Sequence, residues 1–133
     1  MNNLKSVEQK VMSILLDGDE KILCIIRLQE RAAVVSSREM TGVGFYSNFS
    51  VPPHAPRIEG APSFTFGGVD GAATNVRTGL GFVLFVTDRL LDFLEGYTYD
   101  EPWPDEVQGL TLTYSGGASR DMDNLRRALH PNS

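Results

Sequence analysis

The chain has very few of the side chains on which metal sites and nucleophilic catalysis depend. Its 133 residues include one cysteine, Cys24, and two histidines, His54 and His130. A single cysteine cannot form an internal disulfide, and no HExxH, CxxC or histidine cluster is present to bind zinc. Cys24 lies in the apolar run KILCII, so we expect a buried and inert thiol. The sequence therefore predicts neither a metal site nor a cofactor.

Long apolar runs and basic clusters are also missing. No window approaches the ~20 apolar residues that a membrane span needs, and the N-terminal MNNLKSVEQK lacks the basic start and apolar middle of a signal peptide. The formal net charge is −5, and no basic run is longer than Arg126-Arg127. We therefore expect a cytoplasmic protein that binds neither nucleic acid nor membranes. Its acidic charge can instead complement a basic protein partner.

The common nucleotide-binding and hydrolase motifs are absent as well. The sequence contains no GxxxxGK[ST] and no GxSxG. GVGFYS and GLGFVL begin as GxG but continue into apolar alternation, so their glycines are expected to serve turns and close strand approach.

What is present is typical of one globular domain spanning residues 1–133. Charged residues make up 22% of the chain and apolar residues 41%, which is ordinary for such a domain. Apolar spacing predicts a helix over residues 3–16. For residues 20–32 the branched ILCII favours a strand and RLQERAA favours a helix. We expect a helix there, because Asp17 and Asp19 offer N-caps.

From residue 33 the apolar period changes to two, which indicates strands. AVVSSREM and VGFYSNFSV are expected to pair around a Thr41-Gly42 turn, which places Arg38 on the apolar side. Residues 63–76 are typical of an irregular strand with glycine bulges. GFVLFV and LDFLEGYTY form a second expected hairpin, with Asp88-Arg89 as its turn, although this turn usually needs glycine.

The expected fold is α+β, with an antiparallel β-meander of five to six strands. The predicted regions are a helical part over 1–32, the sheet over 33–114 and a C-terminal helix over 119–130. Residues 52–62 contain four prolines and are expected to form a long loop, because proline cannot pair within a central strand.

The acidic, aromatic stretch LEGYTYDEPWPDE, residues 94–106, is the strongest candidate for a functional surface. Two prolines in it cannot donate to a strand ladder, so the strand should end near Tyr99 and continue as a rigid loop. Its carboxylate spacing does not match an EF-hand. Trp103 either covers the core or, if exposed, contacts a partner. The predicted binding residues are Tyr97, Tyr99, Asp100, Glu101, Trp103, Asp105 and Glu106.

Glu95 lies among apolar residues in the predicted strand, opposite Phe82. A desolvated carboxylate needs a partner, and we expect an Arg38–Glu95 ion pair that bridges the two hairpins. Three interpretations remain open for Glu95: a satisfied interior ion pair, an exposed position, or a catalytic group.

Three segments, SREMTGVGFYSNFSVP, GFVLFV and LEGYTYDEPWP, together resemble a family of small bacterial proteins of uncharacterised function. The likeness covers about residues 34–114 and leaves out both terminal helical regions. It implies no reaction, cofactor or site residue. The sequence departs from the family pattern at Asp88-Arg89, where such proteins tend to have Asp-Gly.

Two functions therefore remain open. The first is a non-enzymatic interaction module with an acidic-aromatic surface. An antitoxin or immunity-type role against a basic partner would fit its charge. The second is a small enzyme or ligand-binding protein that uses Glu95, Arg38 and Glu39 in a pocket under residues 52–62. An exposed edge strand would also allow a homodimer.

Overall fold

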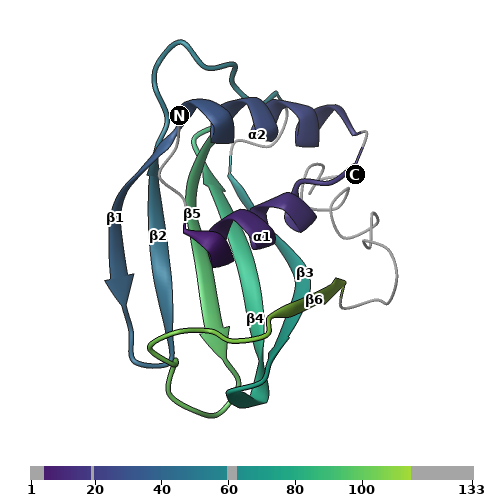
Figure 1. Cartoon of the computed structure of the whole chain (residues 1–133). Helices are drawn as coiled ribbons and strands as arrows, with labels where there is room; N and C mark the ends of the chain where they lie inside the picture. The colour runs from purple at the N-terminus through teal and green to yellow at the C-terminus, as the bar shows by residue number, and fades with distance from the viewer. Residues whose placement is uncertain (1–4, 19, 60–62, 115–133) are drawn as a thin grey trace.

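The computed structural model describes residues 5–18, 20–59 and 63–114, and for residues 66–68 only the backbone. Two helices precede six strands in this part of the chain: α1 (Ser6–Leu15), α2 (Lys21–Ala32), β1 (Val34–Met40), β2 (Gly44–Ser50), β3 (Phe64–Ala73), β4 (Val76–Thr87), β5 (Leu90–Thr98) and β6 (Thr111–Tyr114). The strands form one antiparallel sheet in the order β1-β2-β5-β4-β3-β6. Both helices lie across the same face of this sheet (Figure 1).

The expected meander is wrong. β2 pairs with β5 rather than with β3, and β3 lies between β4 and β6. The described chain is mainly antiparallel sheet with two short N-terminal helices, which corrects the α+β prediction. The connection over residues 51–63 is long enough to place β3 away from β2, and the β4–β5 hairpin then returns beside β2. The predicted C-terminal helix over 119–130 lies outside the described residues.

The core lies between the two helices and the sheet. α2 buries Ile22, Leu23, Ile26 and Gln29, a helical spacing that confirms the helix predicted for residues 20–32. α1 and the central strands supply most of the other fully buried side chains: Val11, Leu15, Leu80, Phe82, Leu84 and Leu94. Burying each such side chain contributes about 1.5–3 kcal/mol. None of the helices in the described part of the chain is long and apolar enough to cross a membrane.

Cys24 is exposed on α2, so the prediction of a buried thiol is wrong. The buried face of this helix contains Leu23 and Ile26, whereas Cys24 lies on the face that is exposed to solvent. Arg27 Nη2 donates a hydrogen bond to its Sγ atom over 3.1 Å.

The turn between β1 and β2 is longer than predicted. Met40 pairs with Phe45, and Thr41 N donates to Gly44 O over 3.0 Å. Arg38 consequently lies opposite Ser47 instead of Phe45. Because the shift is two residues, Arg38 keeps the predicted face, which is the one that the helices cover.

The β4–β5 turn is the predicted two-residue turn at Asp88-Arg89. Both residues have positive φ, 52° and 69°, which a tight hairpin turn of this type requires. Arg89 is tolerated there because its backbone O accepts from Ile58 N and its Nη1 donates to Ile58 O, each over 3.2 Å.

A bulge next to this turn changes the predicted pairing. Leu91 lies opposite Val86 as predicted, but Phe93 then lies opposite Phe85, so Asp92 is an extra residue in β5. Thr87 Oγ1 donates to Asp92 Oδ2 over 2.7 Å. Glu95 therefore does not oppose Phe82 on the core side. A one-residue shift sends every later side chain of the strand to the other face.

Candidate functional site

The sheet face that lies away from the two helices, which we call the open face, carries a row of acidic and aromatic side chains. The strand register places Glu39 of β1, Tyr46 of β2 and Glu95 of β5 side by side. These residues alternate with side chains that face the core, such as Phe45 and Leu94. The two carboxylates therefore flank the tyrosine across three neighbouring strands.

The adjacent row on the open face is aromatic. Phe85 and Phe93 stack with their ring centroids 4.1 Å apart and their planes at 15°. Tyr46 meets Phe93 edge-on, at 5.5 Å and 84°. With Asn48, Glu39 and Glu95 these rings line a shallow hollow of about 410 Å³, which we call the aromatic hollow.

The two carboxylates of the aromatic hollow have no cationic partner in the described part of the chain. Asn48 Nδ2 donates to Glu39 Oε2 over 3.2 Å. Within residues 5–18, 20–59 and 63–114, the Glu95 carboxylate forms neither a hydrogen bond nor an ion pair, and neither acidic side chain pairs with Lys or Arg. Within the described residues, the hollow therefore combines aromatic rings with two carboxylates that no Lys or Arg pairs with.

Tyr97 and Tyr99 extend the aromatic surface towards the end of β5. Tyr97 shares the face of Glu95, and its ring lies over Gly81, where an added Cβ would be 2.5 Å from Tyr97 Cζ. Tyr99 is 53% exposed, meets Tyr97 edge-on at 5.6 Å and donates its hydroxyl to Asp70 Oδ1 over 2.8 Å. Partial burial, together with the hydrogen bond to Asp70, raises the pKa of Tyr99.

Glu101 holds the loop after β5 against the start of β4. Its Oε1 atom accepts from the backbone N–H of Arg77 and of Thr78, both over 2.7 Å, and from Thr78 Oγ1 over 2.8 Å. These hydrogen bonds, those from Thr78 foremost, lower the pKa of Glu101. The neighbouring Asp100 is exposed.

Trp103 covers the core, one of the two roles predicted for it. Its ring is half-buried and meets Phe45 at 5.0 Å and Phe82 at 6.5 Å, both edge-on. Asp105 and Glu106 are exposed beside it. The predicted binding residues are thus divided, because Tyr97 belongs to the open face and Trp103 packs on the core side.

Arg38 pairs with Glu8 of α1, so the predicted Arg38–Glu95 ion pair is wrong. Arg38 Nε and Nη2 donate to the two oxygens of Glu8 over 2.9 and 2.8 Å. Ser47 Oγ and the backbone N–H of Lys5 also donate to this carboxylate. Burial raises the pKa of Glu8, but the hydrogen bonds from Arg38, Ser47 and Lys5 outweigh burial and lower it.

Sequence reasoning missed Glu8, although a signal for it exists. Glu8 precedes Val11, Met12 and Leu15 by three, four and seven residues, and all three are buried. That spacing places the carboxylate on the apolar face of α1. A single acidic residue in such a stripe indicates a buried ion pair.

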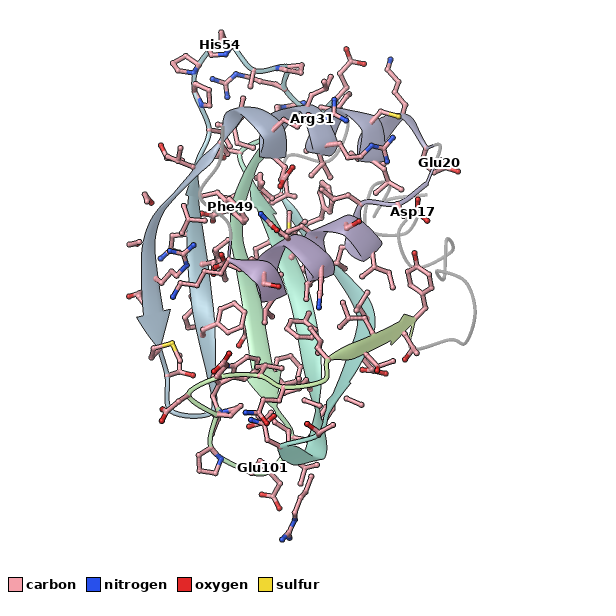
Figure 2. All side chains as sticks on the ribbon, viewed as in Figure 1. Asp17, Glu20, Arg31, Phe49, His54 and Glu101 are labelled. Atoms are coloured by element: carbon pink, nitrogen blue, oxygen red, sulfur yellow. The ribbon has the colours of Figure 1, made fainter. Side chains whose placement is uncertain are left out.

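The structure does not bring Arg38, Glu39 and Glu95 together under residues 52–62. Arg38 lies on the helix side, whereas Glu39 and Glu95 lie on the open face. Figure 2 shows His54, in the proline-rich loop, at the end of the sheet opposite Glu101. A groove of about 790 Å³ does pass beside Arg38, between α1 and the segment that contains Trp103.

No set of three or more His, Cys, Asp and Glu side chains in the described ranges is grouped closely enough to hold a metal ion. His130 lies outside these ranges.

The fold and the open face together define a mainly antiparallel sheet protein, with helices described on one face and an acidic, aromatic surface on the other. No family model, curated protein or solved structure matches the chain. The resemblance to a family of small bacterial proteins therefore stays a prediction.

Proposed function

We propose that this protein is a non-enzymatic interaction module that binds a basic protein partner through its open face. The observation that carries this proposal is the alignment of Glu39, Tyr46 and Glu95 across three strands beside the stacked rings of Phe85 and Phe93. The proposed surface includes Tyr97 and Tyr99, which the sequence already indicated. Its carboxylates are those of Glu39 and Glu95 on the sheet, instead of the predicted ones within residues 100–106.

The aromatic side chains supply the contact area for a partner. Aromatic residues are enriched at the centres of protein interfaces, because rigid rings bury a large area and lose little conformational entropy. Here Tyr46, Phe85 and Phe93 are half-buried and form one continuous cluster. A partner that covers this cluster would remove apolar surface from water.

The charge selects the kind of partner. The chain carries a net charge of −5, and Glu39 and Glu95 have no cationic partner in the described ranges. Aromatic sheet faces can also stack nucleic-acid bases, but carboxylates beside the rings repel phosphate. A basic protein fits both the rings and the carboxylates. A cytoplasmic antitoxin or immunity-type role, in which this acidic protein neutralises a basic one, is consistent with that charge.

The test is capture of a partner from the native host by matched variants of the full chain. The first variant combines Glu39→Gln with Glu95→Gln. The control combines Asp105→Asn with Glu106→Gln, which removes the same charge outside the open face. Captured proteins are identified by mass spectrometry, purified and titrated against each variant by calorimetry.

We expect a basic partner whose affinity falls about tenfold in the open-face variant and less than about twofold in the control, as two surface charge contacts predict. Raising the salt concentration should weaken binding of the wild type more than binding of the open-face variant. Equal losses in the two variants would show that only net charge matters, and the proposal would fail.

A further inference from the structure

The aromatic hollow has the dimensions and chemistry of a site for one cationic side chain. Neighbouring strands lie about 4.8 Å apart, so the backbones of Glu39 and Glu95 are about 10 Å apart across β2. Tyr46 lies between them in the same row. This leaves room for one ammonium or guanidinium group over the ring, with a carboxylate on each side.

Three aromatic rings, those of Tyr46, Phe85 and Phe93, line the hollow. A cation is attracted to an aromatic ring within about 6 Å of its centroid. Phe93 takes part in two ring contacts, with Phe85 stacked on it at 4.1 Å and Tyr46 edge-on at 5.5 Å. These contacts hold the rings in place before a ligand arrives, which reduces the entropy lost on binding.

The charge balance favours a cation from another protein. Neither Glu39 nor Glu95 pairs with a Lys or Arg in the described ranges. A second copy of this chain would bring two such pairs of carboxylates against each other, and like charges oppose that contact. One basic side chain of a different protein can lie between both carboxylates and reduce the net charge of the pair from −2 to −1.

We infer that the aromatic hollow binds a single Arg or Lys side chain of the partner, with its charged group over Tyr46 and Phe93 and between Glu39 and Glu95. This inference rests on the proposed function and names the group that the open face recognises. The contact resembles the recognition of ammonium groups by aromatic rings, with two carboxylates added for charge.

The test is an NMR titration of the full chain with four short peptides that differ only in their central residue: arginine, lysine, citrulline or norleucine. Citrulline keeps the shape of arginine without its charge, and norleucine keeps the stem of lysine. We expect the two charged peptides to shift the ring resonances of Tyr46 and Phe93 and to bind at least about tenfold more tightly than the neutral ones. The Glu39→Gln/Glu95→Gln variant should lose this preference, and the Asp105→Asn/Glu106→Gln control should keep it.

Several results would overturn the inference. Equal binding of the arginine and citrulline peptides would do so, as would shifts that centre on residues 100–106. A full chain with Arg126→Gln and Arg127→Gln whose Tyr46 and Phe93 resonances move without any peptide would show that the chain's own end fills the hollow. A dimer that Phe93→Ser dissociates would place a second copy there.

The two proposals can fail separately. If partner capture depends on the open face but the charged peptides bind no more tightly than the neutral ones, the interaction module stands and the cation site falls. If capture and peptide binding are both insensitive to Glu39 and Glu95, both proposals fall. Circular dichroism spectra of all variants establish that each is folded before either result is interpreted.

Discussion

Replacing Gln29 tests how α2 is fixed to the sheet. Gln29 is 0% exposed and links α2 to two other segments. Its Nε2 atom donates to Pro56 O over 2.8 Å and to Arg89 O over 3.0 Å, and its Oε1 atom accepts from Leu91 N over 2.8 Å. One amide therefore joins the helix to the proline-rich loop and to the β4–β5 turn. Gln29→Met keeps the length of the side chain and removes all three hydrogen bonds.

The expected loss follows from the groups left without a partner. Arg89 O still accepts from Ile58 N, but Leu91 N loses its acceptor and Pro56 O loses its donor. An unsatisfied buried group such as Leu91 N costs about 1–3 kcal/mol, and the cost is lower for the exposed Pro56, whose carbonyl water can reach. Burying a thioether in place of an amide offsets about 1 kcal/mol of this. The free energy of unfolding should therefore fall by about 1–3 kcal/mol, a large share of the about 5–15 kcal/mol typical of a domain.

Urea unfolding followed by tryptophan fluorescence measures this loss. Trp103 is the single tryptophan of the chain and packs on Phe45 and Phe82, so its emission should change on unfolding. Leu28→Met, at a 48% exposed position of the same helix, is the control and should stay within about 0.5 kcal/mol of the wild type. A Gln29→Met protein as stable as that control, with an unchanged urea slope, would refute the reasoning.

Three further predictions concern other contacts. The folded-state pKa of Glu8 lies below its ordinary value of 4.5, so its contribution to stability is present above pH 4.5 and is lost as the pH falls through the folded-state value. Urea midpoints measured against pH should show this loss. Glu8→Gln should cost about 2 kcal/mol at neutral pH and should make the urea midpoint depend less on pH in this range. Gly81→Ala should lower stability by about 1–3 kcal/mol, because the new methyl group meets the ring of Tyr97, and adding Tyr97→Ser should relieve the clash in a double-mutant cycle. Trp103→Leu should lower the thermal midpoint measured by circular dichroism through lost core packing, yet leave partner capture unchanged; a loss of capture in a folded protein would move the binding surface to this residue.

The alternation of apolar residues was enough to predict the two hairpins, including the turn at Asp88-Arg89. It could not predict which strands are neighbours. Residues 51–63 connect β2 to β3, and nothing in their composition says how far across the sheet the chain travels. The order β1-β2-β5-β4-β3-β6 depends on long-range packing, which a local period of two does not encode.

The sequence indicated several residues of the candidate site, but their arrangement on the open face was missed for a related reason. The period of two places Glu95 on the face of Leu91, but the extra residue at Asp92 reverses every later position of β5. Position 92 is neither glycine nor proline, so nothing in LDFLEGY indicates the bulge. Arg38 was assigned to the correct face and the wrong partner, because Glu8 lies 30 residues away in a helix whose packing was unknown.

The bulge at Asp92 links the packing of the core to the chemistry of the open face. Without it, Phe93, Glu95 and Tyr97 would point towards α1 and α2, and an unpaired carboxylate would replace the buried Leu94. Burying that charge would oppose folding, so the register that buries Leu94 also exposes Glu95 beside Tyr46. The acidic, aromatic surface therefore follows from the same pairing that completes the core, and the proposed partner site needs no rearrangement of the sheet.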